Sequence, residues 1–255
     1  MTTASSTASA NGDVFGGHGR LGYIAPSTCE RAAREFYGLA PDGVAMLIAT
    51  LPIAQLSDTD VDAALAGIAT AAEQLVQTGA DIVFSAGIPL VLRSGIAGNR
   101  ALRERLEEVT GCPVGTDLEA TVDAIRAVAA ERIVVVSPFK EELHTRYMPI
   151  LGECGLQVLA DVAMEYDRQI EYGKLPDDAP LEVAQRLVAE HPDVDAVYMP
   201  CGRIGNALEI SRWEERLGRP VVTANQAMIW WTLQQFGVSS PSSVGGCLLT
   251  RVGGS

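Results

Sequence analysis

The stretch that decides the fold is DAVYMPC at residues 195–201, because DIVFSAG at residues 81–87 repeats its pattern. In each stretch an Asp is followed by three apolar residues, the last of which is aromatic. Short apolar runs of this kind are typical of the buried strands of a parallel sheet. The sixth residue after the Asp is Gly87 in the first stretch and Cys201 in the second. The pattern indicates a duplicated chain that carries a thiol at this position in one copy only.

The repeat extends well beyond these strands. RLGYIAP at residues 20–26 matches RIVVVSP at 132–138, and GCPVGT at 111–116 matches GRPVVT at 218–223. The interval from the proline of the first motif to the repeated Asp is 55 residues in one copy and 57 in the other. Units of this length exceed those of solenoid proteins. The sequence therefore predicts two homologous lobes.

Short apolar runs alternate with longer amphipathic ones, which is typical of βαβ units. We predict an α/β fold of two pseudo-symmetric lobes, each a mainly parallel sheet flanked by helices. The predicted strands are 20–25, 43–49, 80–86 and 112–115, followed by 132–137, 156–161, 194–200 and 219–223. The predicted helices are 58–78, 98–109, 117–130, 140–153, 179–190, 205–217 and 225–236.

Domain boundaries follow from the repeat. Residues 20–115 plus 224–255 are expected to form an N-terminal lobe, and residues 116–223 a C-terminal lobe. Residues 1–19 are rich in Ser, Thr, Ala and Gly, and are expected to be a disordered leader. Ligands of open parallel sheets bind at the carboxyl ends of the strands. An active-site cleft is therefore expected between the lobes.

Composition excludes several classes of partner. With 19 basic and 32 acidic residues, the net charge of −13 argues against nucleic acid and anionic membranes as partners. Five cysteines and three histidines show no metal-binding spacing, so no metal is expected. Reduced thiols suit a cytoplasmic protein. The pair Trp230 and Trp231 predicts either core packing or a subunit interface, which leaves a homo-oligomer open.

Cys201 is the candidate catalytic residue. It ends a predicted strand, and Gly202 after it would let a ligand approach the backbone closely. A helix predicted to begin near Gly205 would lower the pKa of the thiol through its N-terminus. The alternative is an inert buried cysteine. Cys29 follows the first strand, and either lines the cleft or simply starts a helix.

These motifs resemble the aspartate/glutamate racemase superfamily, and within it the branch of arylmalonate decarboxylases and maleate cis–trans isomerases. The resemblance rests on YIAPST at 23–28, DIVFSAGIPL at 81–90, VVVSPFKEELHTRYMPIL at 134–151, DAVYMPCG at 195–202 and GRPVVTANQA at 218–227. It implies two pseudo-symmetric lobes with the active site between them. It also implies chemistry without a cofactor, at the carbon next to a carboxylate of a small carboxylic acid.

The resemblance implies a role for the single thiol. Racemases and maleate isomerases of this type have a cysteine in each lobe, whereas arylmalonate decarboxylases have glycine in the first lobe, as at Gly87. The implied reaction is decarboxylation, in which Cys201 protonates an enediolate as a general acid. Two-thiol racemisation is disfavoured. The implied substrate-binding residues are Ser27, Thr28, Gly87, Ile88, Phe139 and Gly202.

The chain also departs from the decarboxylase pattern. Ile88 and Pro89 stand where those enzymes have a pair of hydroxyl residues, and Phe139 stands where they have tyrosine. Each missing hydrogen bond to a charged group is worth about 1.5–3 kcal/mol. Two alternatives therefore stay open: a maleate-type isomerase using Cys201 as nucleophile, and a non-catalytic carboxylate-binding relative.

Other side chains could replace the missing hydrogen-bond donors. Donors near the predicted strand ends are Ser27, Thr28, Thr116, Thr223 and Asn225, although either of Thr116 and Thr223 could instead cap a helix. Arg93 and Arg203 occupy comparable places after Gly87 and Cys201. Each is either a carboxylate-binding group or a solvated surface residue.

Overall fold

The computed structural model describes residues 15–53, 57–166, 171, 174, 176 and 178–250. Most of the leader expected over residues 1–19 lies outside these ranges, and the first strand begins at Gly19. No helix in the described ranges is both long enough and apolar enough to cross a lipid bilayer.

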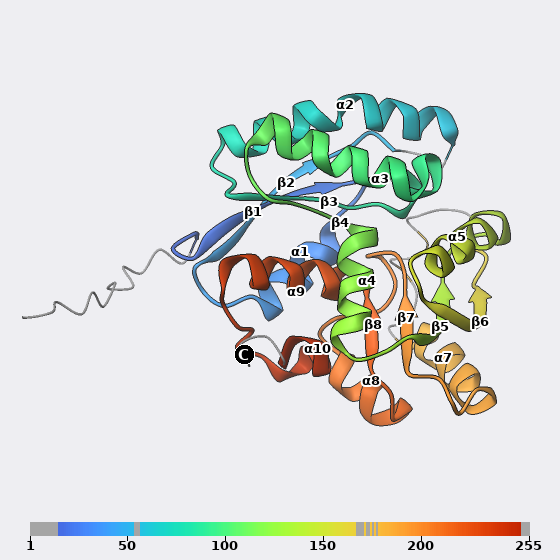
Figure 1. The fold of residues 1–255 in the computed structure, drawn as a ribbon. Coiled ribbons are helices and arrows are strands. Elements are labelled where there is room, and N and C mark those ends of the chain that lie inside the picture. Colours follow the sequence, from blue (N-terminus) through green and yellow to red (C-terminus); the bar gives the residue numbers. More distant parts are fainter. Residues whose placement is uncertain are drawn as a thin grey trace, which may run out of the picture.

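Each half of the chain forms a four-stranded parallel sheet (Figure 1). The first sheet has the order β2-β1-β3-β4 and the second the order β6-β5-β7-β8. The strands are β1 (Gly19–Ala25), β2 (Val44–Thr50), β3 (Ile82–Ser85), β4 (Val114–Thr116), β5 (Arg132–Ser137), β6 (Gln157–Ala163), β7 (Ala196–Met199) and β8 (Val221–Thr223). The identical strand order confirms the α/β fold of two pseudo-symmetric lobes.

The Asp that opens each repeated motif ties two strands together. Oδ2 of Asp81 accepts a hydrogen bond from the backbone N–H of Arg20 at 2.7 Å, and the N–H of Asp81 donates to the carbonyl of Arg20 at 2.8 Å. Asp195 makes both contacts with Arg132, each at 2.8 Å. The carboxylate thus satisfies a backbone donor at the start of the first strand of each sheet.

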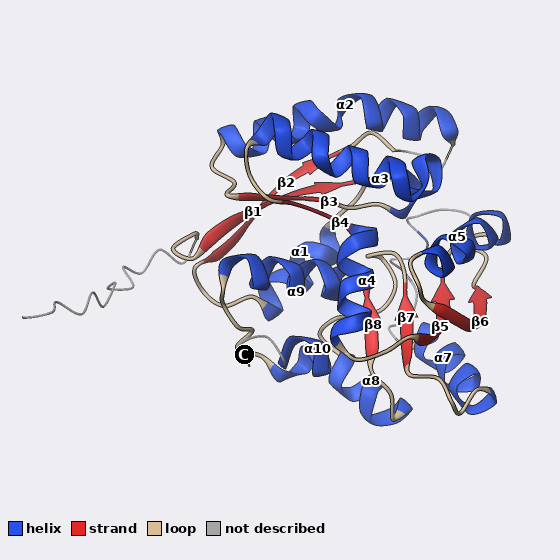
Figure 2. Ribbon diagram, viewed as in Figure 1, coloured by secondary structure: helices blue, strands red, loops and turns tan. Residues whose placement is uncertain are grey.

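Helices cover both faces of each sheet (Figure 2). The outer faces pack against α2 (Asp58–Gln77) and α3 (Ile88–Thr110) in the first lobe, and against α7 (Ala179–Glu190) and α8 (Ile210–Leu217) in the second. The remaining helices are α1 (Glu30–Leu39), α4 (Asp117–Ala127), α5 (Glu141–Glu153), α9 (Ala224–Phe236) and α10 (Gly246–Thr250), with a 3₁₀ turn at Ser243–Gly245.

One apolar core joins the lobes. Alternate strand residues face opposite sides, so Ile24 packs with the outer helices while Leu21 faces the centre. The central cluster also contains Ile133 of the second sheet and Ile229 of α9, all with no exposed surface. Burial of each such side chain contributes about 1.5–3 kcal/mol.

We keep as a proposal the lobe boundaries 20–115 plus 224–255 and 116–223, which fall at the strand ends preceding α4 and α9.

Two helix predictions had the wrong start, and one helix was missed. Helix α3 begins at Ile88, not at residue 98, because Pro89 is well suited to a first turn, where its missing N–H has no helical partner. A kink at Gly95, with φ 67° and ψ −175°, separates its two parts. Helix α8 begins at Ile210, not at 205, so turns follow Cys201. Helix α1 was not among the predicted helices.

Candidate active site

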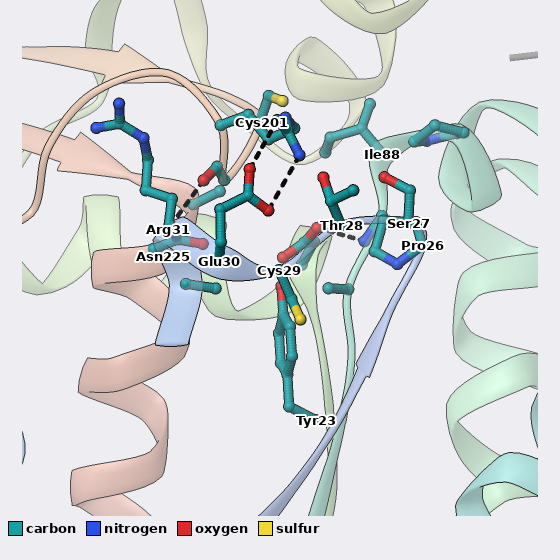
Figure 3. Close-up of a pocket in the computed structure, with 18 of the residues that line it drawn as sticks. Tyr23, Pro26, Ser27, Thr28, Cys29, Glu30, Arg31, Ile88, Cys201 and Asn225 are labelled. Carbon is teal, nitrogen blue, oxygen red and sulfur yellow. Dashed lines mark hydrogen bonds and ion pairs between the residues drawn. The ribbon is translucent and has the colours of Figure 1, made fainter. Parts of the chain in front are cut away.

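A cavity of about 60 Å³ lies where the carboxyl ends of strands from both sheets meet (Figure 3). The structure brings Cys201 and all six predicted substrate-binding residues together along its wall. These are Ser27, Thr28, Gly87, Ile88, Phe139 and Gly202. Segments that are more than a hundred residues apart in the chain therefore build one site. Its volume admits only a few water molecules or a small acid.

Cys201 lies just beyond the end of β7 and has a positive φ of 85°. This backbone conformation is costly for any residue other than glycine, and such strain concentrates at functional sites. Burial raises the pKa of the Cys201 thiol to about 11, although the backbone N–H groups of Arg203 and Ile204 act in the opposite direction. The expectation of a helix N-terminus that lowers this pKa was wrong, because α8 begins nine residues after Cys201.

Gly87 occupies the equivalent place beyond β3. Its φ of 131° favours glycine, and a Cβ atom built there would lie 3.2 Å from Cβ of Pro26. The backbone N–H of Gly87 donates a 2.5 Å hydrogen bond to Oδ2 of Asp117. At Gly87 the cavity wall therefore has the carboxyl group of Asp117, whereas the equivalent part of the wall has the thiol of Cys201.

Asp117 is a cavity residue that the sequence reasoning missed. It is the first residue of α4 and is only 9% exposed. Burial raises its pKa to about 7, against the lowering effect of the Gly87 N–H. A signal was present in the sequence, since Asp117 opens a predicted helix one residue beyond a predicted strand, at the strand end where parallel sheets bind ligands. Its counterpart in the second copy of the repeat, Ala224, also lines the cavity.

Most of the remaining wall is apolar. Ile88 and Phe139 are 2% and 3% exposed. The hydroxyl side chains of Ser27 and Thr28 come from the loop before α1 and lie near Ile88 in Figure 3. Cys29 lines the cavity and is also the N-cap residue of α1, so both interpretations of this residue hold. Burial raises the pKa of its thiol.

The other candidate donors have structural partners. Thr116 accepts a hydrogen bond from the N–H of Glu119 and caps α4, and Thr223 forms a capping box with Gln226 at the start of α9. The helix-cap interpretation of both threonines is confirmed. The side chain of Asn225 does line the cavity, but its amide donates to Glu35 at 2.8 Å and to the carbonyl of Gly202 at 2.9 Å.

The two candidate arginines differ sharply. Arg93 lies on the outer surface of the first lobe and forms a bidentate pair with Asp62 at 2.7 Å. Arg203 lines the cavity with a side chain that is 8% exposed, and its Nη2 lies 2.9 Å from Oε1 of Glu30. Nε of Arg203 is buried with no hydrogen-bond partner in the described part of the chain. The surface interpretation thus holds for Arg93 but not for Arg203.

Two further features limit the chemistry. Within the described ranges, no cluster of three or more His, Cys, Asp or Glu side chains could hold a metal ion. His144 accepts or donates hydrogen bonds with Ser137 at 2.7 Å and with Asp161 at 2.6 Å, an order that resembles a serine-hydrolase triad. Ser137 has no exposed surface, so it cannot reach a substrate. These three residues instead hold the end of β5, from which Phe139 enters the cavity.

Known proteins share this architecture. The family model described as arylmalonate decarboxylase matches residues 21–249. The chain belongs to the arylmalonate decarboxylase family. The arylmalonate decarboxylase of Bordetella bronchiseptica is 25% identical over 215 residues, which covers 82% of this chain and 87% of that protein. The family assignment confirms the resemblance drawn from the sequence motifs.

Solved structures of the family have the same fold. Maleate isomerase Iso from Pseudomonas putida S16 matches with a TM-score of 0.82 at 22% identity. The match covers 91% of this chain and 98% of the isomerase chain. A crystal structure of arylmalonate decarboxylase has a TM-score of 0.80 at 23% identity, and covers 91% and 99%. The protein is therefore an enzyme of the lyase and isomerase types found in the aspartate/glutamate racemase superfamily.

Proposed function

We propose that the protein decarboxylates a small malonate-type acid without a cofactor, and that Cys201 is the proton donor. The observation that supports this most is the composition of the cavity. The thiol of Cys201 lines it from the end of β7, while the equivalent position at the end of β3 is Gly87. One face of the bound substrate would then contact the thiol of Cys201, whereas the opposite face, at Gly87, would have no thiol to donate a proton. That asymmetry suits protonation on a single face.

The apolar wall supports the loss of carbon dioxide. A carboxylate held against Ile88 and Phe139 would lose its hydration, which favours its departure as neutral CO₂. The bonding electrons pass into the remaining carboxyl group and form an enediolate. Cys201 then transfers its S–H proton to the carbon, and the resulting thiolate recovers a proton from solvent.

The second carboxyl group of the substrate needs donors. Arg203 is the cationic side chain closest along the chain to Cys201, and its Nε has no protein partner among the described residues. We propose that Arg203 and the backbone N–H of Gly202 bind the carboxyl group that stays on the product. A charge-assisted pair of this kind is stronger than the neutral hydrogen bonds of a hydroxyl group.

The pKa of Cys201 favours decarboxylation over isomerisation. Addition to maleate requires a thiolate, and a pKa of about 11 leaves only about one thiol in ten thousand ionised at pH 7. A general acid must instead keep its proton. Isomerisation stays as the second candidate because Ile88 and Pro89 stand where arylmalonate decarboxylases have a pair of hydroxyl residues.

The test is turnover of a substrate panel in D₂O. Malonate, methylmalonate, phenylmalonate and maleate are incubated with the protein, and CO₂ release and deuterium incorporation are measured. Cys201→Ala should reduce CO₂ release by about 10²–10⁴-fold. Cys112→Ala, which removes a thiol outside the cavity, should not reduce it.

Each other outcome selects a different function. Fumarate formed from maleate without CO₂ would assign the isomerase. Ligand binding without turnover in either protein would assign the non-catalytic relative, and full activity of Cys201→Ala would exclude the proposed mechanism. A cytoplasmic location and a homo-oligomeric state also stay proposals, which cell fractionation and light scattering would test.

A further inference from the structure

The two copies of the repeat supply different reactive groups at equivalent places. Strands β4 and β8 both end in a threonine that caps the next helix, so Asp117 and Ala224 are equivalent first residues of α4 and α9. Both line the cavity. The second copy of the repeat therefore combines Cys201 with Ala224, while the first copy combines Gly87 with Asp117. The first copy lacks the thiol at this place but has a carboxyl group that the second copy lacks.

The position of Asp117 is set by the backbone. The N–H of Gly87 donates to its Oδ2 at 2.5 Å, and the carboxyl group is nine-tenths buried within the cavity wall. Among the described residues, the N–H of Gly87 is the donor that hydrogen-bonds to the carboxyl group of Asp117. The second oxygen, Oδ1, is then the atom available to a ligand.

No cation among the described residues neutralises Asp117. The cavity arginines are already paired, Arg203 with Glu30 at 2.9 Å and Arg31 with Glu35 at 3.8 Å. The titratable groups that interact with Asp117 across the cavity are Tyr23 of β1 and Cys201 after β7, and in the second-lobe core Tyr147 of α5 and Tyr198 of β7. Burial raises the pKa of each of these groups, so all are neutral at pH 7.

A carboxylate ligand would therefore meet a buried carboxyl group without a counter-ion. Two carboxylates in one buried site do not both ionise, and one of them holds a proton. Desolvation holds the pKa of Asp117 at about 7, against the Gly87 N–H and against its place in the first turn of α4, which favours the charged form. Little free energy is thus needed to keep Asp117 protonated near neutral pH.

We propose that Asp117 acts as a neutral carboxylic acid whose O–H donates a hydrogen bond to the carboxyl group that stays on the product, and then to the enediolate that forms from that group. This role of Asp117 extends the proposed function. It rests on that function because the enediolate forms only if the protein is a decarboxylase. A protonated acid of this kind can stand in for a hydroxyl group, as a buried Asp does in ketosteroid isomerase. Asp117 would replace donors that Ile88, Pro89 and Phe139 cannot supply.

Proton uptake on ligand binding tests the protonation state without turnover. Phenylacetate and maleate are titrated calorimetrically into the protein between pH 6 and 9, in buffers of different ionisation enthalpy. The wild type should take up close to one proton per bound ligand at pH 8.5 and less at pH 6. Asp117→Asn should take up none, because its amide keeps both the acceptor for Gly87 and a donor for the ligand.

Asp123→Asn is the matched control, since Asp123 lies on the same helix with a side chain that is 59% exposed. It should behave as the wild type does. Absence of proton uptake by the wild type at every pH would overturn the proposal, as would a wild type that binds none of the carboxylates. If the protein binds amino acids more tightly than these carboxylates and takes up no proton, then Asp117 is ionised and binds the ammonium group of the ligand. That result would also overturn the proposal.

Turnover then separates a hydrogen-bond donor from a base. For a substrate found with the malonate panel, kcat/KM of the wild type should fall as the pH rises through 7, while Asp117→Asn keeps activity within about 10-fold and loses this fall. A rate that rises with pH and an inactive Asp117→Asn would identify a base and overturn the proposal. If no malonate reacts, the decarboxylase proposal fails, and the calorimetry still decides whether Asp117 is neutral.

Discussion

Nη2 of Arg203 lies 2.9 Å from Oε1 of Glu30, and this ion pair connects the loop after β7 to the first turn of α1 across the cavity. Its two partners are unequal, since the side chain of Arg203 is 8% exposed and that of Glu30 is 62% exposed. Glu30 can move into solvent at little cost, whereas Arg203 must keep an anionic partner. An incoming carboxylate can therefore take the place of Glu30.

Arg203→Met should weaken carboxylate binding. A hydrogen bond to a charged group is worth about 1.5–3 kcal/mol, so the Kd for maleate or phenylmalonate should rise by about 10–150-fold. Arg93→Met is the control, because Arg93 pairs with Asp62 on the outer surface. Isothermal titration of both variants measures the effect. Equal affinities would show that Arg203 has no contact with the ligand.

Replacements of Cys201 should separate activity from stability. The positive φ of 85° at this position strains every residue except glycine. Cys201→Gly and Cys201→Ala should both lose decarboxylation. The free energy of unfolding of the glycine variant should be about 1 kcal/mol larger than that of the alanine variant. Urea denaturation of the two proteins measures this difference. A less stable glycine variant would mean that the backbone relaxes without cost.

The buried carboxyl group of Asp117 should make stability depend on pH. Its folded pKa of about 7 lies above the unfolded value of about 3.9, so the folded state binds the additional proton between these values. The stabilising contribution is complete below pH 4 and is lost as the pH rises to 7. Relative to Asp117→Asn, the wild type should lose up to about 4 kcal/mol of unfolding free energy between pH 4 and 8.

Denaturation of both proteins at several pH values gives that difference directly. Other carboxyl groups titrate in this range, but their contributions cancel between wild type and variant. Asp123→Asn should follow the wild type throughout. A constant difference between wild type and Asp117→Asn would mean that Asp117 has an ordinary pKa.

Asp195 should stabilise the second lobe through the opposite shift. The side chain of Arg132 lowers the pKa of Asp195 to about 2, with further help from the backbone N–H groups of Arg132 and Glu131. The contribution is therefore present above pH 4 and is lost as the pH falls to 2. Because the side chain is 26% exposed, we expect Asp195→Asn to cost about 1–2 kcal/mol at pH 7 after allowance for solvent screening.

The exposed neighbour Asp193 provides the comparison. It also approaches Arg132, at 3.4 Å, but its side chain is 61% exposed. Asp193→Asn should change the unfolding free energy by less than about 0.5 kcal/mol. If both variants are equally destabilised, then the strand-to-strand hydrogen bonds of Asp195 have no special part in holding β5 and β7 together.

The sequence by itself determined the duplication, the two parallel sheets and the pairing of Gly87 with Cys201. Each of these depends on local patterns, such as apolar strand runs and the order of short motifs, and such patterns are written in consecutive residues. Helix starts were less secure. The start of α3 at Ile88 was missed because Pro89 is also a common loop residue.

Only the tertiary structure decided the environment of the reactive groups. The pKa of Asp117 is raised because the folded chain buries its carboxyl group in the cavity wall, where the N–H of Gly87, thirty residues away, donates to its Oδ2. Arg203 becomes a buried cation because α1 brings Glu30 to it from 173 residues away. Desolvation and pairing depend on the atoms that surround a side chain, and segments distant in the chain supply those atoms. The same residues in an unfolded chain would have ordinary pKa values and no site.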